Sequence, residues 1–152
     1  MSRVKYKVYV LVINVLFVVS GFAGTKGSCL QVAKTQLEMN QCAGTSYKLV
    51  DTELNRVYKL IRQQYKKNPQ FLAKLKISQL AWIKLRDANM NMQFPAKNKR
   101  LEYGSVYPMC SSLVEKKIVL RRIVYLKQWL KGVEEGDVCS GSIKLSTETQ
   151  TK

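Results

Sequence analysis

Residues 79–87 read QLAWIKLRD, and this stretch decides the fold. With its flanks it places a residue every three or four positions on one helical stripe: Leu72, Leu75, Gln79, Trp82, Arg86 and Met90. A guanidinium is therefore aligned with an indole on the face that turns toward the core. Because an unpaired buried charge costs about 3–5 kcal/mol, the fold must bring a carboxylate to Arg86. The alternative is that Arg86 reaches out to solvent.

The preceding segment, residues 35–67, has the pattern of an amphipathic helix. It opens with the capping box Thr35-Gln36-Leu37-Glu38. Apolar residues then follow at spacings of three and four: Met39, Ala43, Tyr47, Val50, Leu54, Val57, Ile61 and Tyr65. Asn68-Pro69 ends the helix, because the residue before a proline avoids the helical region. We predict a second helix from Pro69 to about Gln93.

So short a connection predicts that the two helices are antiparallel neighbours. Folding the chain about residues 67–68 brings Arg86 level with residues 48–50, within one turn of both Asp51 and Glu53. We therefore predict Asp51 as the carboxylate that pairs with Arg86. Asn40 and Asp51 lie close to three helical turns apart and flank the same edge of the apolar stripe. The polar core predicted on these grounds is structural and has no catalytic role: Arg86, Asp51, Trp82, Gln79 and Asn40.

A third apolar stretch, residues 118–130, reads IVLRRIVYLKQWL and is ambiguous by itself. Its β-branched residues favour a strand, whereas its length and the stop at Lys131-Gly132 favour a helix. Two helices need a third face to cover them, so we predict a helix that opens at the capping-box candidate Ser112-Leu113-Val114-Glu115. The predicted fold is all-α, an antiparallel helical hairpin plus a third helix in a three-helix up-down bundle.

The connector at residues 93–109 has a basic tip, Lys97-Asn98-Lys99-Arg100. A connection longer than about 12–15 residues is often functional, although a basic run is also typical of a solvated loop. The third helix carries further cations among apolar residues. They either extend to solvent from a core helix or form a cationic amphipathic surface. The candidate binding surface consists of Lys97, Lys99, Arg100, Arg121 and Lys127.

The N-terminus has the features of a secretory signal peptide at residues 1–23. Three basic residues precede an apolar run at residues 8–19, and cleavage is predicted after Ala23. The run is shorter than the roughly 20 residues of a spanning helix, and an uncleaved anchor is the alternative. We expect a helical domain at residues 24–132 and a polar, poorly ordered tail at residues 133–152. The mature protein is then periplasmic or secreted, with no membrane span.

The charge balance is strongly basic, with 26 Lys and Arg against 10 Asp and Glu. Three of the cations lie in the predicted signal, so the mature chain has 23 against 10 and a net charge of +13. Such a field attracts anionic wall polymers, lipids or nucleic acid, and export disfavours the last. Excess charge also simply keeps a small protein soluble.

The residue types restrict the chemistry. The chain has no histidine, which removes Ser-His and Cys-His nucleophiles and His-rich metal sites. We predict no enzyme activity, no metal and no cofactor. Four cysteines in an exported protein of this size predict two disulfides with three possible connectivities, and free buried thiols are the alternative. These cysteines are Cys29, Cys42, Cys110 and Cys139.

Several short motifs follow one another in a set order between Cys29 and Cys110. They are Thr35-Gln36, Glu38-Met39-Asn40, Cys42, Asp51, Glu53-Leu54-Asn55, Tyr58, Gln79, Trp82, Arg86-Asp87-Ala88 and Gly104-Ser105. In this the chain resembles the LprI-like lysozyme-inhibitor family. The resemblance implies a disulfide-stapled, exported helical domain and adds Asn55 to the polar core. Lysozyme inhibition is the named activity, and no catalytic residues carry over.

Two features depart from that family. It tends to place a cysteine shortly after the Arg-Asp of the second helix, where this chain has Met90, and the fourth cysteine here is Cys139. We therefore favour the pairs Cys42–Cys110 and Cys29–Cys139. Charge is the second departure, because animal lysozymes are basic and two positive proteins repel at encounter.

Two functions follow from the sequence. The first is binding and inhibition of lysozyme or a related muramidase, which requires a local acidic patch. The acidic cluster available is Glu134, Glu135 and Asp137. The rival is a cationic envelope-surface module that binds an anionic wall polymer or lipid.

Overall fold

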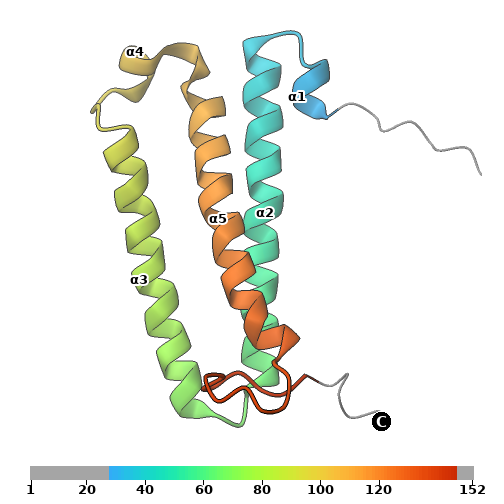
Figure 1. Cartoon of the computed structure of the whole chain (residues 1–152). Coiled ribbons are helices and arrows are strands. Elements are labelled where there is room, and N and C mark those ends of the chain that lie inside the picture. The colour runs from blue at the N-terminus through green and yellow to red at the C-terminus, as the bar shows by residue number, and fades with distance from the viewer. Residues whose placement is uncertain (1–27, 147–152) are drawn as a thin grey trace, which may run out of the picture.

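The computed structural model describes residues 28–146, and the described part is helical. Its elements are α1 (Cys29–Val32), α2 (Gln36–Gln64), α3 (Pro69–Gln93), α4 (Lys99–Tyr103), the 3-10 helix η1 (Gly104–Val106) and α5 (Tyr107–Lys131). The three long helices run down, up and down the molecule (Figure 1), which confirms the predicted all-α up-down bundle. The predicted signal peptide at residues 1–23 lies outside the described residues. No described helix has the length and apolar content needed to cross a membrane.

The α2–α3 hairpin begins and turns where the sequence predicts. The Thr35 hydroxyl accepts a bond from the Glu38 backbone N–H (3.2 Å), and the Glu38 carboxylate accepts one from the Thr35 N–H (3.1 Å). Backbone donors at Lys34 and Thr35 lower the pKa of Glu38. At the start of α3 the Asn68 side chain accepts a bond from the Phe71 N–H (3.0 Å), and Pro69 sits in the first turn, where it loses no helical bond.

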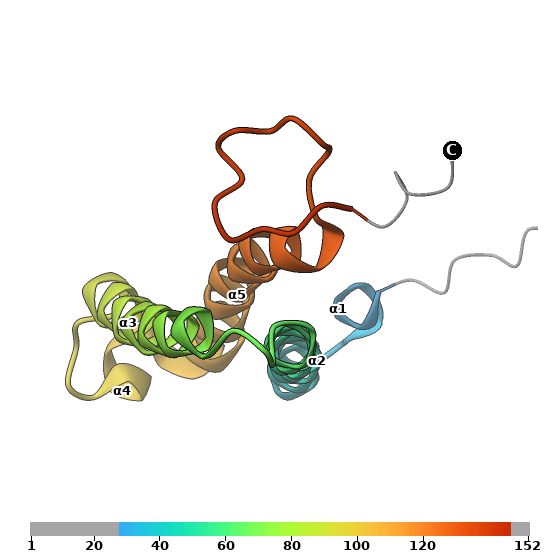
Figure 2. The same ribbon diagram turned by 90° about the horizontal axis from the view of Figure 1, so that it is seen from below.

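The hydrophobic core lies mainly between α2 and α5. Its buried residues are Leu54, Val57, Ile61, Tyr65, Leu75, Val119, Ile123 and Leu126. Helix α3 contributes only Leu75 to this set, and α3 packs against α5 rather than against α2. Seen from below, α5 passes between α3 and α2, and its C-terminal end is displaced toward the loop of residues 132–146 (Figure 2). The direct α2–α3 packing expected from the short turn is therefore largely replaced by contacts with α5.

The connector between α3 and α5 is more regular than predicted. It contains α4 and η1, and α5 begins at Tyr107 rather than at the predicted cap Ser112. Three aromatic rings hold the connector together: Phe94 lies 5.5 Å from Tyr103 and 5.2 Å from Tyr107, between ring centroids. The helical prediction for residues 118–130 is confirmed.

Helix α5 ends at Gly132, as predicted, and the chain then closes a loop. Gly132 has a φ of 81°, and a Cβ there would lie 2.8 Å from the Ser146 backbone, so glycine is required. The Val133 N–H donates to the Lys144 carbonyl (3.0 Å), and the Lys144 N–H donates to the Tyr65 hydroxyl (3.2 Å). Residues 133–146 belong to the tail that was predicted to be poorly ordered. These hydrogen bonds fasten them to the end of the bundle.

Candidate functional site

Asn40 ties α2 to the start of α5. Its side-chain Nδ2 donates to the Ser105 carbonyl (3.0 Å), and its Oδ1 accepts from the Met109 backbone N–H (3.1 Å). The first turn of α5 has no side-chain cap of its own at Val106. Because the first N–H groups of a helix lack intrahelical partners, Asn40 supplies the missing acceptor from the neighbouring helix.

Arg86 lies against Trp82, as the helical stripe predicts, but the carboxylates that contact Arg86 do not include the predicted partner, Asp51. Its guanidinium lies 5.7 Å from the Trp82 ring centroid. Its Nη2 is 2.7 Å from an oxygen of Asp87, and its Nε is 3.6 Å from Glu115 on α5. The prediction of Asp51 as partner is therefore wrong. Helix α5 lies between α2 and α3 (Figure 1), so α5 supplies the longer-range acid.

Glu115 also accepts a hydrogen bond from the Tyr47 hydroxyl of α2 (2.8 Å). Burial and this bond raise the pKa of Tyr47 above its usual range. Glu115 thus joins all three long helices through Tyr47 on α2 and Arg86 on α3. From the sequence, Glu115 was predicted only as part of a capping box, so its contacts with Tyr47 and Arg86 were not foreseen.

A second guanidinium, Arg122 on α5, is buried at the α3–α5 interface with 8% of its surface exposed. Its Nε donates to Gln79 Oε1 (3.1 Å) and its Nη2 to the Ser78 hydroxyl (3.0 Å). It lies 5.7 Å from the Trp82 ring centroid and 5.3 Å from that of Tyr125. Burial lowers the pKa of Arg122.

Within residues 28–146 no carboxylate forms an ion pair with Arg122, so neutral oxygens and two aromatic faces stabilise its charge. The burial of Arg122 was not predicted from the sequence. Its signal was present, because the stripe Glu115, Val119, Arg122 and Leu126 has the same spacing as the α3 stripe.

Replacing Arg86 by alanine is expected to lower the free energy of unfolding by about 2 kcal/mol, because Glu115 and Tyr47 then lose a partly buried cation. The side chain of Arg86 is 18% exposed, so the loss is smaller than for a fully buried pair. Urea denaturation followed by circular dichroism measures the change. The exposed Arg121 on α5 is the matched control, and Arg121→Ala is expected to change stability by less than about 0.5 kcal/mol. Equal effects of the two substitutions would contradict the geometry.

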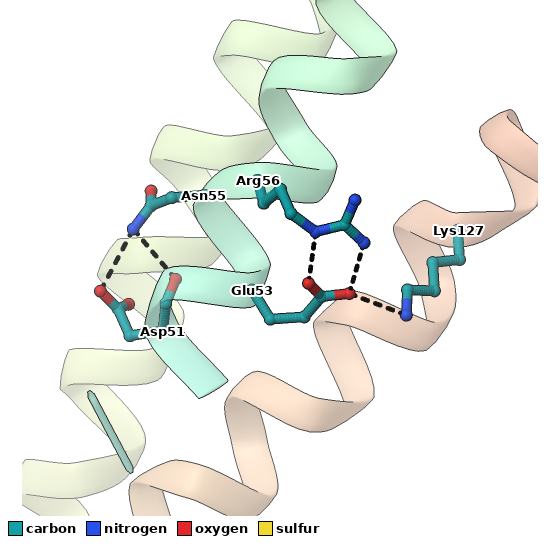
Figure 3. Close-up of polar contacts among 5 residues, drawn as sticks. All are labelled: Asp51, Glu53, Asn55, Arg56 and Lys127. Carbon is teal, nitrogen blue, oxygen red and sulfur yellow. Dashed lines mark hydrogen bonds and ion pairs between the residues drawn. The ribbon is translucent and has the colours of Figure 1, made fainter. Parts of the chain in front are cut away.

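Asp51 is half-buried on α2, and its side chain contacts Asn55 of the same helix (Figure 3). Asn55 is exposed, and its Nδ2 donates to the Asp51 carbonyl (3.0 Å) and carboxylate (3.2 Å) within the helix. Asn55 is therefore not part of a buried polar core, and Asp51 makes its side-chain hydrogen bond within α2. Their neighbour Glu53 makes the contact with α5 instead.

Lys127, one of the predicted binding residues, pairs with Glu53. Its Nζ lies 2.9 Å from Glu53 Oε1, and Arg56 Nε lies 2.6 Å from Glu53 Oε2 (Figure 3). Bonds from Arg56 and then Lys127 lower the pKa of Glu53 to about 2. Lys127 thus links α5 to α2 and shares the single Glu53 carboxylate with Arg56.

The other predicted binding residues do not form one surface. Lys97, before α4, and Arg100, within α4, are exposed, whereas Lys99 donates to the backbone carbonyls of Phe94 and Ala96. Arg121 is exposed on α5, about 21 Å along that helix from its first residue. The candidate cationic surface is thus divided between one end and the middle of the bundle.

The disulfide pairing differs from the prediction. The bond joins Cys29 on α1 to Cys42 on α2, and Cys110 and Cys139 are free thiols. Cys110 lies near the start of α5, whose 25 residues rise about 37 Å, and Cys139 lies beyond its other end. Disulfide-bonded Cα atoms lie about 4.4–6.8 Å apart. The C-terminal loop is fastened at the other end of the bundle and keeps Cys139 farther than this from Cys29. The predicted pairs Cys42–Cys110 and Cys29–Cys139 are wrong.

Residues 29–126 match the sequence model of the family described as lysozyme inhibitor LprI. The match begins at the disulfide, ends at the buried Leu126 of α5, and covers more than half of the chain. The chain belongs to the LprI lysozyme-inhibitor family. An uncharacterized protein of Rhizobium meliloti (strain 1021) is 28% identical to it over 114 residues, which cover 67% of this chain and 78% of that protein. No solved structure matches the chain.

In this LprI-family chain several motif residues have clear structural roles. Asn40 holds the start of α5, and Gln79 holds the buried Arg122. Both guanidiniums lie 5.7 Å from the Trp82 ring centroid, and Arg86 reaches Glu115. These contacts fix where α3 and α5 lie.

Charge on this LprI-family chain is unevenly distributed. Between Glu53 and Asp87 the sequence contains nine Lys and Arg and no acidic residue. This acid-free segment covers the C-terminal third of α2 and most of α3. Three exposed acids gather instead in the loop after α5, at Glu134, Glu135 and Asp137, where they line a cavity of about 720 Å³.

Proposed function

We propose that this protein binds lysozyme or a related wall-lytic enzyme and inhibits it, and that it acts by binding rather than by catalysis. The match of residues 29–126 to the lysozyme inhibitor LprI family is the observation that carries the proposal. The absence of histidine from the sequence supports a binding role.

We also propose that the protein is exported, to the periplasm or beyond. The signal-peptide pattern of residues 1–23 supports export. The Cys29–Cys42 disulfide fits the same compartment, because disulfides persist in oxidising environments.

The docking face that fits a basic enzyme is the acidic loop after α5. A cationic chain repels a cationic lysozyme at most orientations, so the exposed acids Glu134, Glu135 and Asp137 have to direct the encounter. This loop is held in place by Trp129, whose Nε1 donates to the Ser142 hydroxyl (3.0 Å), and by Lys144, whose Nζ donates to the Gln64 carbonyl (2.8 Å).

The purified, oxidised protein is expected to slow lysozyme lysis of a cell-wall suspension stoichiometrically, at both about 50 and about 150 mM salt. The double substitution Glu134→Lys and Glu135→Lys should weaken inhibition about tenfold, because it removes the acids that oppose repulsion. Turbidity measures the lysis rate. Glu102→Lys, an exposed position on α4 at the opposite end of the bundle, is the control for added charge.

An unchanged lysis rate at equimolar protein would contradict the inhibitor proposal. Equal weakening by Glu102→Lys and by the double substitution would leave inhibition intact as a function but contradict the acidic loop as the docking face.

The second candidate function is binding of an anionic wall polymer through the acid-free segment between Glu53 and Asp87. Its nine cations favour this function. A polymer binder leaves lysozyme kinetics unchanged. It sediments with purified anionic wall polymer at low salt and is released as salt screens the charges.

A further inference from the structure

A groove lies between α2 and α3, and every residue that lines it belongs to one of these two helices. Helix α5 packs against both α2 and α3, whereas these two helices make few contacts with each other, which leaves room for the groove. Its cavity has a volume of about 560 Å³. The groove belongs neither to the disulfide end of the molecule nor to the acidic loop.

The floor of the groove is apolar and partly open to solvent. Tyr58 contributes from α2, and Leu72, Leu80 and Ile83 contribute from α3. Leu80 is 51% exposed although it faces the cavity. Grouped apolar side chains that remain exposed, rimmed by polar residues, are typical of binding grooves.

The rim of the groove is cationic. Arg62 on α2 and Lys76 on α3 line it, and within residues 28–146 neither forms an ion pair. Both belong to the acid-free segment, so no acid within that segment offsets them. Glu53, at one end of the segment, is already bound to Arg56 and Lys127.

We propose that this groove binds a single-chain anionic amphiphile, a long-chain fatty acid anion. The acyl chain lies along Tyr58, Leu72, Leu80 and Ile83, and the carboxylate pairs with Arg62 and Lys76. The cavity is within the range of small-molecule sites, about 300–1,000 Å³. The cationic rim repels a second copy of this basic chain and attracts an anionic headgroup. This ligand site is additional to the proposed binding of a lysozyme.

The test uses laurate below its micelle concentration, titrated into the purified, oxidised protein by calorimetry. We expect saturable binding of one laurate per chain and no binding of acetate, which lacks the chain. Leu80→Glu is expected to weaken binding about tenfold by placing a charge on the apolar floor. Ile77→Glu is the matched control, because Ile77 is 60% exposed on the same helix and does not line the groove.

A second pair of variants tests the headgroup. Lys76→Glu is expected to weaken laurate binding about fivefold. Lys74 is also exposed but does not line the groove, so Lys74→Glu should change laurate binding less than about twofold. Neutral dodecyl maltoside should bind more weakly than laurate and be insensitive to Lys76→Glu. Circular dichroism establishes that each variant keeps its helix content.

Three outcomes would overturn the proposal. They are no saturable binding of laurate, equal effects of Leu80→Glu and Ile77→Glu, and a dimer in sedimentation that Leu80→Glu dissociates. The last would show that a second copy occupies the groove. The titration contains no lysozyme, so its failure leaves the proposed inhibition standing.

Discussion

Replacing Leu126 by alanine is expected to lower the free energy of unfolding by about 2–5 kcal/mol. Leu126 is 1% exposed on α5 and belongs to the cluster that joins α5 to α2. The substitution removes buried methyl groups and leaves a cavity where the main helix pair meets. Urea denaturation followed by circular dichroism measures the loss.

Leu120→Ala on the same helix is the matched control for the Leu126 substitution. Leu120 is 41% exposed, and its loss is expected to cost less than about 1 kcal/mol, because much of that side chain is already in water. Equal costs at the two positions would mean that α5 does not present the Val119–Ile123–Leu126 face to α2.

The second large effect is expected from the Cys29–Cys42 disulfide. Cys29→Ser should lower the free energy of unfolding by about 3 kcal/mol, because the bond closes a short loop and restricts the unfolded chain. The bonded residues are 13 apart in the sequence. Cys29 is exposed, so this substitution removes the bond with little loss of packing.

Cys139→Ser is the matched control for the disulfide variant. Cys139 is an exposed free thiol, and its substitution should change stability by less than about 0.5 kcal/mol. Alkylation of the unreduced natural protein should label Cys110 and Cys139 and spare the bonded pair. A protein that takes up no label would contradict the pairing.

The helices themselves could be read from local signals. The capping box at Thr35 and the proline at position 69 act within one turn, and they set the starts of α2 and α3. The apolar periodicity identified the buried faces, because spacings of three and four place Leu54, Val57 and Ile61 on one side of α2. The stop at Gly132 was equally local, since a left-handed φ favours glycine.

The candidate site was predicted less well, for a physical reason. The sequence indicated that Arg86 needs an acid, and the structure provides Asp87 beside it and Glu115 on α5. The choice of Asp51 assumed that the two helices joined by a short turn are also packed side by side. Arg122 was missed because the cations of the third helix were expected either to extend to solvent or to form a cationic surface, whereas α3 covers Arg122 with Ser78 and Gln79.

The sequence by itself determined the first two long helices, their buried stripes and the need to neutralise a guanidinium beside Trp82, because caps and periodicity depend on neighbours within a few residues. The pattern of residues 118–130 was ambiguous alone, and the third helix was predicted because the first two need a covering face. Only the tertiary structure decided that α5 lies against both α2 and α3, that Glu115 serves Arg86, and that Cys29 pairs with Cys42. The reason is that helix arrangement depends on the packing of whole faces, and many arrangements satisfy the same local pattern. That arrangement also leaves the α2–α3 groove open.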